Sequence, residues 1–287
     1  MTASNGVDGY VTARDGLRLH YRDHPGGAGQ PPLLCLHGLT RNARDFAEFA
    51  ERYSPDWRVI ALDFRGRGLS DYDPLPMRYN PLTYAGDVVQ LLDALSIAKA
   101  IFVGTSLGGL VTMAIAAMAP QRIAASILND VGPELTDAGL ERIRAYVGKD
   151  VRFASWEDAA AAIASNNRHV PASYDREDWL KAARRACREE QGEVLFDYDA
   201  AIAVPFQTQG ATPAVDLWPL FRALGRQPML VIRGEQSDLL SAEALQKMHE
   251  AVPDMKSVTV AGVGHAPVLD EPDAVVAIDA FLADLAV

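Results

Sequence analysis

The stretch Ala100-Ile101-Phe102-Val103-Gly104-Thr105-Ser106-Leu107-Gly108-Gly109 decides the fold of this chain. Its apolar run over residues 101–103 predicts a buried strand, and the apolar run over residues 110–118 predicts a helix. Ser106 lies between them, with a glycine two residues to either side. Small neighbours leave room for the sharp turn that exposes a serine between a strand and a helix. The pattern therefore predicts a nucleophile elbow at Ser106.

Strand and helix patterns alternate on both sides of this stretch. A hairpin is expected across Asp15-Gly16, where two β-favouring runs face each other. Further strands are expected at 33–36, 59–62, 123–128, 229–232 and 257–260, and helices at 43–53, 81–96, 214–224 and 272–285, with one more that opens near Ser241. Alternation of this kind predicts an α/β fold with a mostly parallel sheet flanked by helices.

The alternation breaks at Gly132-Pro133 and resumes near residue 213. The intervening residues indicate helices with charged faces and no clear strand. We therefore expect a helical cap insertion over residues 132–212, and a core domain formed by residues 1–131 and 213–287.

Composition narrows the classes of partner. The 287 residues are 49% hydrophobic and 23% charged, as in ordinary globular proteins, and the formal net charge is −11. An acidic chain does not suit the nucleic-acid backbone, so a small-molecule substrate is expected instead. No run approaches the length of a membrane span, and the first residues lack a basic start and an apolar core, so we expect no membrane partner and a cytoplasmic location.

The cysteines and histidines predict neither a disulfide nor a metal site. Cys35 and Cys187 give no reason for a bridge, and reduced thiols are expected. The histidines outside the glycine-rich motifs show no cluster at metal-ligand spacing, so no metal and no cofactor are expected. The oligomeric state is not determined by the sequence.

A nucleophilic serine needs a base that takes its proton and an acid that orients the base. His265 follows the strand expected at 257–260, and Asp238 follows the strand expected at 229–232. We therefore expect His265 as the base and Asp238 as the acid. Asp130, just past an earlier strand, is the alternative acid, and Glu235 lies closer than Asp238 to the end of its strand.

Four motifs together carry a family resemblance. They are Leu36-His37-Gly38-Leu39, the run from Asp63 to Asp71 (DFRGRGLSD), the elbow, and the Asp238 segment paired with Gly262-Val263-Gly264-His265. In this order and spacing they resemble the α/β-hydrolase superfamily over nearly the whole chain.

The resemblance implies an eight-stranded α/β-hydrolase sheet and a serine-nucleophile mechanism. It makes Ser106 the nucleophile, His265 the general base and Asp238 the orienting acid, in the chain order described for this fold. It further implies that the backbone N–H groups of Leu107 and Leu39 form the oxyanion hole. His37 is expected to shape the loop rather than to act as a second base.

Several reactions fit these residues. The leading hypothesis is cleavage of an ester or related acyl bond of a small, apolar or aromatic substrate through an acyl-enzyme. The alternatives are a carbon–carbon bond hydrolase of aromatic-ring meta-cleavage products, a cofactor-free perhydrolase or haloperoxidase, and a hydrolase-fold small-molecule receptor. Trp156 and Phe206 are candidate substrate-binding residues in the insertion. Branches of the fold that attack with aspartate are disfavoured, because Ser106 stands at the elbow.

Overall fold

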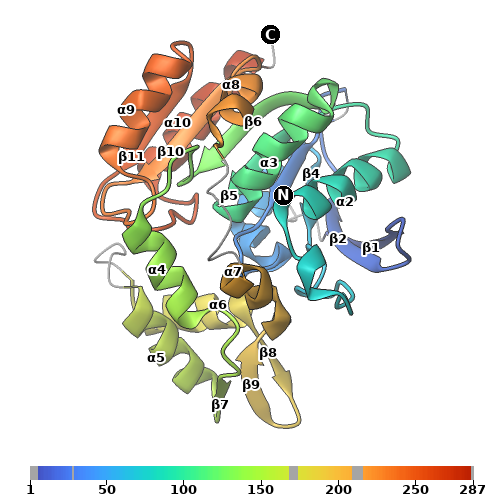
Figure 1. The fold of residues 1–287 in the computed structure, drawn as a ribbon, viewed down its shortest axis with the longest axis vertical. Helices are drawn as coiled ribbons and strands as arrows, with labels where there is room; N and C mark the ends of the chain where they lie inside the picture. Colours follow the sequence, from blue (N-terminus) through green and yellow to red (C-terminus); the bar gives the residue numbers. More distant parts are fainter. Residues whose placement is uncertain (1–5, 28, 168–173, 209–215, 286–287) are drawn as a thin grey trace.

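The computed structural model describes residues 6–27, 29–167, 174–208 and 216–285. Its centre is an eight-stranded sheet in the order β1-β2-β4-β3-β5-β6-β10-β11 (Figure 1). The strands are β1 (Val7–Thr12), β2 (Arg18–His24), β3 (Leu33–Leu36), β4 (Val59–Leu62), β5 (Ala100–Thr105), β6 (Ile123–Asn129), β10 (Met229–Gly234) and β11 (Lys256–Val260). The predicted α/β fold with an eight-stranded sheet is confirmed.

The strand pairing is parallel from β4 to β11 and antiparallel at one edge. β3, β4, β5, β6, β10 and β11 run in the same direction, so their carboxyl ends meet at one edge of the sheet. β1 pairs with β2, and β2 with β4, in antiparallel fashion, which confirms the predicted hairpin. Loops at the shared carboxyl edge of parallel strands are the usual place for a ligand site in such sheets.

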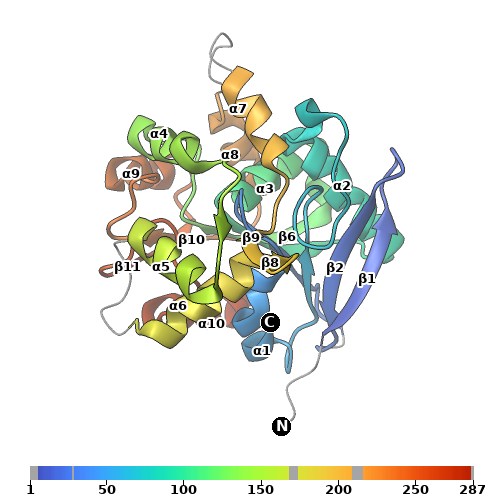
Figure 2. The ribbon, with the colours of Figure 1, turned by 90° about the horizontal axis from the view of Figure 1, so that it is seen from below.

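Helices cover both faces of the sheet, because the side chains of each central strand alternate between two apolar layers. Leu34 and Leu36 of β3 belong to the apolar cluster that includes residues of α2, α3 and α8, whereas Leu33 and Cys35 belong to the cluster that includes residues of α1 and α10. The first three helices lie on one side of the sheet and the other two on the opposite side (Figure 2). The helices of the core are η1 (Ala43–Phe46), α1 (Ala47–Tyr53), η2 (Pro76–Arg78), α2 (Pro81–Ala94), α3 (Leu107–Met118), η3 (Pro120–Arg122), α8 (Trp218–Leu224), α9 (Ala242–Ala251) and α10 (Pro272–Leu285). Within the described ranges, no helix is long and apolar enough to cross a membrane.

Between β6 and α8 the chain leaves the sheet and forms an insertion beyond its carboxyl edge (Figure 1). The insertion contains α4 (Asp137–Tyr146), β7 (Arg152–Phe153), α5 (Trp156–Asn166), α6 (Arg176–Ala186), β8 (Cys187–Glu190), β9 (Glu193–Phe196), η4 (Ala200–Ala203) and α7 (Val204–Thr208). The expected boundary at residues 212–213 lies outside the described residues. The division into a core and a cap therefore stays a prediction.

The expectation that the insertion lacks strands is wrong, because β7, β9 and β8 form a small antiparallel sheet. β8 and β9 are joined by Gln191 and Gly192, which both have positive φ, at 54° and 83°. Two such residues build the tight turn that suits a hairpin. β8 is Cys-Arg-Glu-Glu, with only Cys187 buried, so the strand carries no apolar alternation to reveal it.

Polar contacts fasten the insertion to the core. Arg44, in η1, donates from Nη2 to Asp197 Oδ2 at 2.7 Å and to the Cys187 carbonyl at 3.1 Å. The backbone N–H of Gly68 donates to the carbonyl of Asp197 at 3.1 Å. Tyr79 of the core donates its hydroxyl hydrogen to Asp199 Oδ2 at 2.6 Å. The segments that follow β3 and β4 are thereby tied to β8 and to the residues that follow β9.

Candidate active site

Ser106 stands at the turn between β5 and α3, as predicted. Its backbone has φ 51° and ψ −112°, a left-handed conformation that is strained for a serine. A Cβ added at Gly108 would lie 2.0 Å from the Leu36 carbonyl oxygen, and one added at Gly104 would lie 2.6 Å from the Gly108 backbone. Gly104 and Gly108 therefore allow the backbones of β5, α3 and β3 to approach one another closely. This close packing holds the strained turn against β3.

His265, on the loop after β11, reaches the serine. Its Nε2 lies 3.0 Å from Ser106 Oγ, and its Nδ1 lies 2.7 Å from Asp130 Oδ2. A carboxylate accepts only, so Nδ1 carries the hydrogen, and Nε2 is left free to accept the serine proton. The Asp130 side chain is fully buried, and 11% of the His265 side chain is exposed. Serine, imidazole and carboxylate thus form one continuous hydrogen-bonded chain.

Asp130 follows the last residue of β6 directly and has φ 55°. Its carboxylate is held on both oxygens: the Gly234 N–H donates to Oδ1 at 2.9 Å, and Ser237 Oγ donates to Oδ2 at 2.6 Å. Asn129 connects the same region, because its carbonyl accepts the Ser106 N–H at 3.0 Å, and its amide donates to the Pro267 carbonyl at 2.7 Å. The end of β6 therefore positions all three groups.

The expected partnership of Asp238 with His265 is corrected by the structure. Asp238 instead forms a two-point ion pair with Arg142 of α4, with Nη2 at 2.8 Å from Oδ1 and Nε bonded to Oδ2. Burial raises the pKa of this carboxyl, but the hydrogen bonds and the positive charge of Arg142, together with smaller contributions, outweigh burial and hold the pKa below its ordinary value. Arg142 lies 96 residues away in sequence, so no local pattern reveals the pair. The alternative acid, Asp130, occupies the place expected for Asp238.

Glu235 is also placed away from the imidazole. Its Oε2 accepts the backbone N–H of Gly262 at 2.8 Å, and its own backbone N–H donates to the Val260 carbonyl at 2.9 Å. Glu235 therefore braces the start of the glycine-rich loop that carries His265.

The loop after β3 lies beside the serine. A Cβ added at Gly38 would lie 3.9 Å from Ser106 Cβ. The Phe64 N–H donates to His37 Nε2 at 3.1 Å, so Nδ1 of this buried ring carries a hydrogen and donates to the Gly38 carbonyl at 2.7 Å. Burial lowers the pKa of His37 to about 4, and the ring stays neutral. His37 is thus a structural residue of the loop, as expected.

The two predicted oxyanion donors lie on elements next to Ser106. Leu107 is the first residue of α3, where a backbone N–H has no acceptor within the helix. The Leu39 N–H belongs to the same peptide unit as the Gly38 carbonyl that His37 holds. The N–H and C=O of a trans peptide point in opposite directions, so fixing this carbonyl also fixes the direction of the Leu39 N–H. Arg67 holds the next peptide unit by donating to the Leu39 carbonyl at 3.0 Å.

The remaining predicted motif, residues 63–71, supports the loop that follows β3. Asp63 binds His20 Nδ1 at 2.7 Å and accepts the Ala43 N–H at 2.6 Å. Arg65 is buried and pairs with Asp87, Asp73 and Asp15 at 2.6 to 2.7 Å. Both charged residues are therefore engaged in holding turns.

The candidate substrate residues lie in the insertion. Trp156 packs against an apolar cluster of α5, α6 and β9, and its indole N–H donates to Glu189 Oε2 at 3.3 Å. These contacts belong to the core of the insertion itself. Phe206 is half-buried in α7. Contact of either residue with a substrate stays a prediction.

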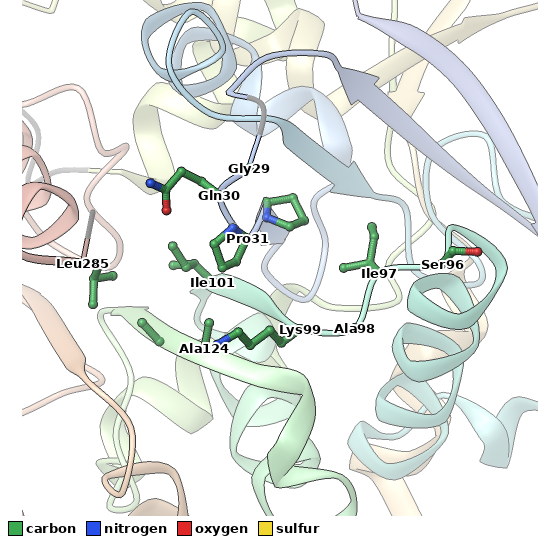
Figure 3. Close-up of a pocket in the computed structure, with 12 residues that line it drawn as sticks. Gly29, Gln30, Pro31, Ser96, Ile97, Ala98, Lys99, Ile101, Ala124 and Leu285 are labelled. Atoms are coloured by element: carbon green, nitrogen blue, oxygen red, sulfur yellow. The ribbon is translucent and has the colours of Figure 1, made fainter. Parts of the chain in front are cut away.

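A separate cavity of about 640 Å³ opens at the opposite end of the sheet (Figure 3). Residues from the amino ends of β3, β5 and β6 line it, among them Pro31, Ile97, Lys99 and Ala124. Ser106, Asp130 and His265 follow the carboxyl ends of their strands, so this cavity is not part of their site. The described residues contain no group of three or more His, Cys, Asp or Glu side chains arranged to hold a metal ion.

Sequence patterns do not identify the polar residues that support the site. Ser237 and Arg142 each hydrogen-bond directly to one of the two competing carboxylates, and the sequence predicts a role in the site for neither of them. One sequence signal could have pointed to Ser237. It lies next to Asp238 at the end of a strand, where a serine hydroxyl can donate a hydrogen bond to a carboxylate. Which carboxylate each group binds depends on long-range packing.

Comparison with known proteins agrees with the fold. Residues 31–272 match the family described as alpha/beta hydrolase fold. The chain is 37% identical to a 3-hydroxybutyrate-oligomer hydrolase of Cupriavidus necator over 89% of each chain, and 30% identical to a 2-(acetamidomethylene)succinate hydrolase of Mesorhizobium japonicum over 92% of each. A crystal structure of an alpha/beta hydrolase from Novosphingobium aromaticivorans superimposes with a TM-score of 0.92 at 49% identity, covering 98% of this chain and 99% of that one. This chain belongs to the α/β hydrolase fold family.

Proposed function

We propose that this protein is a serine hydrolase that cleaves an ester bond through an acyl-enzyme, with Ser106 as nucleophile, His265 as base and Asp130 as acid. The observation that carries the proposal is the unbroken chain from Ser106 Oγ to His265 at 3.0 Å and from His265 to Asp130 at 2.7 Å. This arrangement satisfies the geometric requirement for activating a serine hydroxyl.

In the first half of the proposed reaction, Ser106 Oγ attacks the substrate carbonyl while His265 Nε2 takes its proton. The imidazolium that forms is stabilised by the buried Asp130 carboxylate at Nδ1. The carbonyl oxygen becomes negative and accepts hydrogen bonds from the N–H groups of Leu107 and Leu39. Collapse of this intermediate breaks the ester bond, and His265 gives its proton to the departing alcohol.

In the second half, a water molecule replaces the alcohol. His265 takes a proton from the water as the water oxygen attacks the acyl carbonyl, and the same two N–H groups stabilise the second oxyanion. Breakage of the bond to Ser106 returns the proton to Oγ and releases the carboxylic acid. The three residues are then restored, and no other group needs to change its charge.

Similarity indicates which ester to test first. An oligomer of a hydroxy acid is joined by ester bonds, and the relative at 37% identity is named for such an oligomer. We therefore propose a short ester of a small hydroxy acid as the substrate class. Carbon–carbon cleavage of meta-cleavage products and peracid formation are the alternative reactions.

The test combines a panel of p-nitrophenyl esters from acetyl to octanoyl with the linear dimer of 3-hydroxybutyrate. The wild-type protein should hydrolyse at least one ester with repeated turnover, and Ser106→Ala should lower kcat by at least about a thousandfold. A fluorophosphonate probe should label Ser106 in the wild type only. Unchanged turnover in Ser106→Ala would refute the mechanism, and a single turnover with retained product would favour the receptor alternative.

A further inference from the structure

The loop after β10 reaches the proposed triad through Ser237. Ser237 Oγ lies 2.6 Å from Asp130 Oδ2, the same oxygen that faces His265 Nδ1 at 2.7 Å. Asp238, the next residue, points to Arg142 instead. The sequence predicts that the loop after β10 supplies the acid, Asp238. The loop instead supplies the hydroxyl group of Ser237, which hydrogen-bonds to Asp130 at the end of β6.

The direction of the Ser237 hydrogen bond follows from its other partners. The backbone N–H groups of Leu239 and Leu240 donate to Ser237 Oγ at 3.2 and 3.1 Å. A hydroxyl oxygen has two acceptor positions and one hydrogen. Both acceptor positions are occupied, so the hydrogen is directed at Asp130.

The Asp130 carboxylate is consequently held at two points. The Gly234 N–H fixes Oδ1 at 2.9 Å, and Ser237 fixes Oδ2. These contacts prevent rotation of the carboxylate about its Cβ–Cγ bond, and Oδ2 stays in line with the imidazole N–H. Because Asp130 is fully buried, water cannot readily replace a missing donor.

We infer that Ser237 is a positioning residue for catalysis: it orients the Asp130 carboxylate and, through it, His265. The inference rests on the proposed function and adds a residue to it. The loop after β10 thus contributes to the chemical step through Ser237 and not through Asp238.

The test compares Ser237→Ala with Ser241→Ala. Ser241, four residues further on, caps α9 by accepting the Ala244 N–H at 3.0 Å, so its removal also costs a loop hydroxyl and some stability. We expect Ser237→Ala to lower kcat on a p-nitrophenyl ester by about ten- to a hundredfold with KM within about twofold, because the lost bond acts on a charged group in the chemical step. Ser241→Ala should keep both constants.

Two further variants and a substrate-free signal complete the test. Ser237→Thr should restore most of kcat, and Ser237→Cys, with its weak donor, should lie between wild type and Ser237→Ala. The NMR signal of His265 Nδ1–H, identified by its loss in Asp130→Asn, should move in Ser237→Ala and stay in place in Ser241→Ala.

The inference is overturned if Ser237→Ala keeps kcat and the NMR signal unchanged, or if it loses no more activity than Ser241→Ala. Should Ser237→Ala not fold, wild-type kcat and an unshifted signal in Ser237→Cys would overturn the inference equally. Failure of the proposed function would give a different result. The wild-type protein would then neither hydrolyse esters nor react with the phosphonate probe. The NMR comparison would still decide whether Ser237 orients Asp130.

Discussion

At the residue scale, the two histidines of the glycine-containing motifs differ in what surrounds them. His265 is partly exposed and bonded to a serine and a carboxylate, so it can exchange a proton. His37 is enclosed, accepts one backbone N–H and donates to one carbonyl. Histidine is therefore a candidate base in the loop of His265 and a structural residue in the loop of His37.

The burial of His37 predicts a dependence of stability on pH. Burial lowers the pKa of His37 to about 4 in the folded protein, whereas an unfolded histidine titrates near its ordinary value of 6.5. Between these values the unfolded chain binds a proton that the folded protein does not. The free energy of unfolding should therefore fall, by up to about 3 kcal/mol from this group, as the pH drops from 6.5 to 4.

Urea unfolding of wild type and His37→Gln at a series of pH values measures this effect. The variant should be less stable at neutral pH, since it loses the fit of the ring between Phe64 and Gly38, and the gap between the two proteins should narrow on acidification. Other titrating groups are common to both proteins and cancel. Parallel curves over this range would show that His37 does not titrate as its burial requires.

At the element scale, the elbow depends on how closely α3 approaches β3 and β5. A Cβ at position 108 would collide with the Leu36 carbonyl oxygen, which belongs to the backbone of β3 and cannot rotate away. Gly108→Ala should therefore destabilise the protein by at least about 3 kcal/mol and lower its soluble yield. Thermal or urea unfolding provides the measurement.

Gly86→Ala is the matched control. Gly86 also lies within a helix, α2, but a Cβ there would meet no other group within 4 Å. Alanine has the higher helix propensity, so this variant should gain about 0.5 to 1 kcal/mol. Equal effects of the two substitutions would mean that close packing of the elbow is not what selects glycine.

Most core elements could be predicted from the sequence because their signals are local. Asn80-Pro81 begins α2, with Asn80 accepting the Thr83 N–H at 3.0 Å, and buried apolar runs mark β3 to β6. β8 could not be predicted, because three of its four residues are charged and its pairing with β9 depends on a turn. The choice of Asp130 could not be predicted either, since it depends on Gly234 and Ser237, which lie 104 and 107 residues away.

At the scale of the whole molecule, the insertion is held over the carboxyl edge of the sheet by partly buried polar contacts. Asp197 is central to them, with its buried carboxylate paired to Arg44 at 2.7 Å and Arg188 at 3.4 Å. Asp197→Ala should lower the free energy of unfolding by about 1 to 3 kcal/mol, because it removes the charge-assisted hydrogen bond from Arg44 of the core and leaves Arg188 of the insertion without this partner.

Glu193→Ala is the control for this change. Glu193 pairs with Arg152 at 3.1 Å within the insertion, and both side chains are largely exposed. Exposed pairs contribute about 0 to 1 kcal/mol, so this variant should change stability less than Asp197→Ala. Equal losses by urea unfolding would argue against Asp197 as an anchor of the insertion.

The central claim is that Asp130, and not Asp238, serves the Ser106–His265 pair. The most direct measurement is kcat/KM of Asp130→Asn and Asp238→Asn on the same p-nitrophenyl ester, with folding checked by circular dichroism. We expect Asp130→Asn to lose about a thousand- to ten-thousandfold, because the amide cannot stabilise the imidazolium or keep its tautomer, and Asp238→Asn to stay within about tenfold of wild type. Near-normal activity in Asp130→Asn together with a thousandfold loss in Asp238→Asn would contradict the claim.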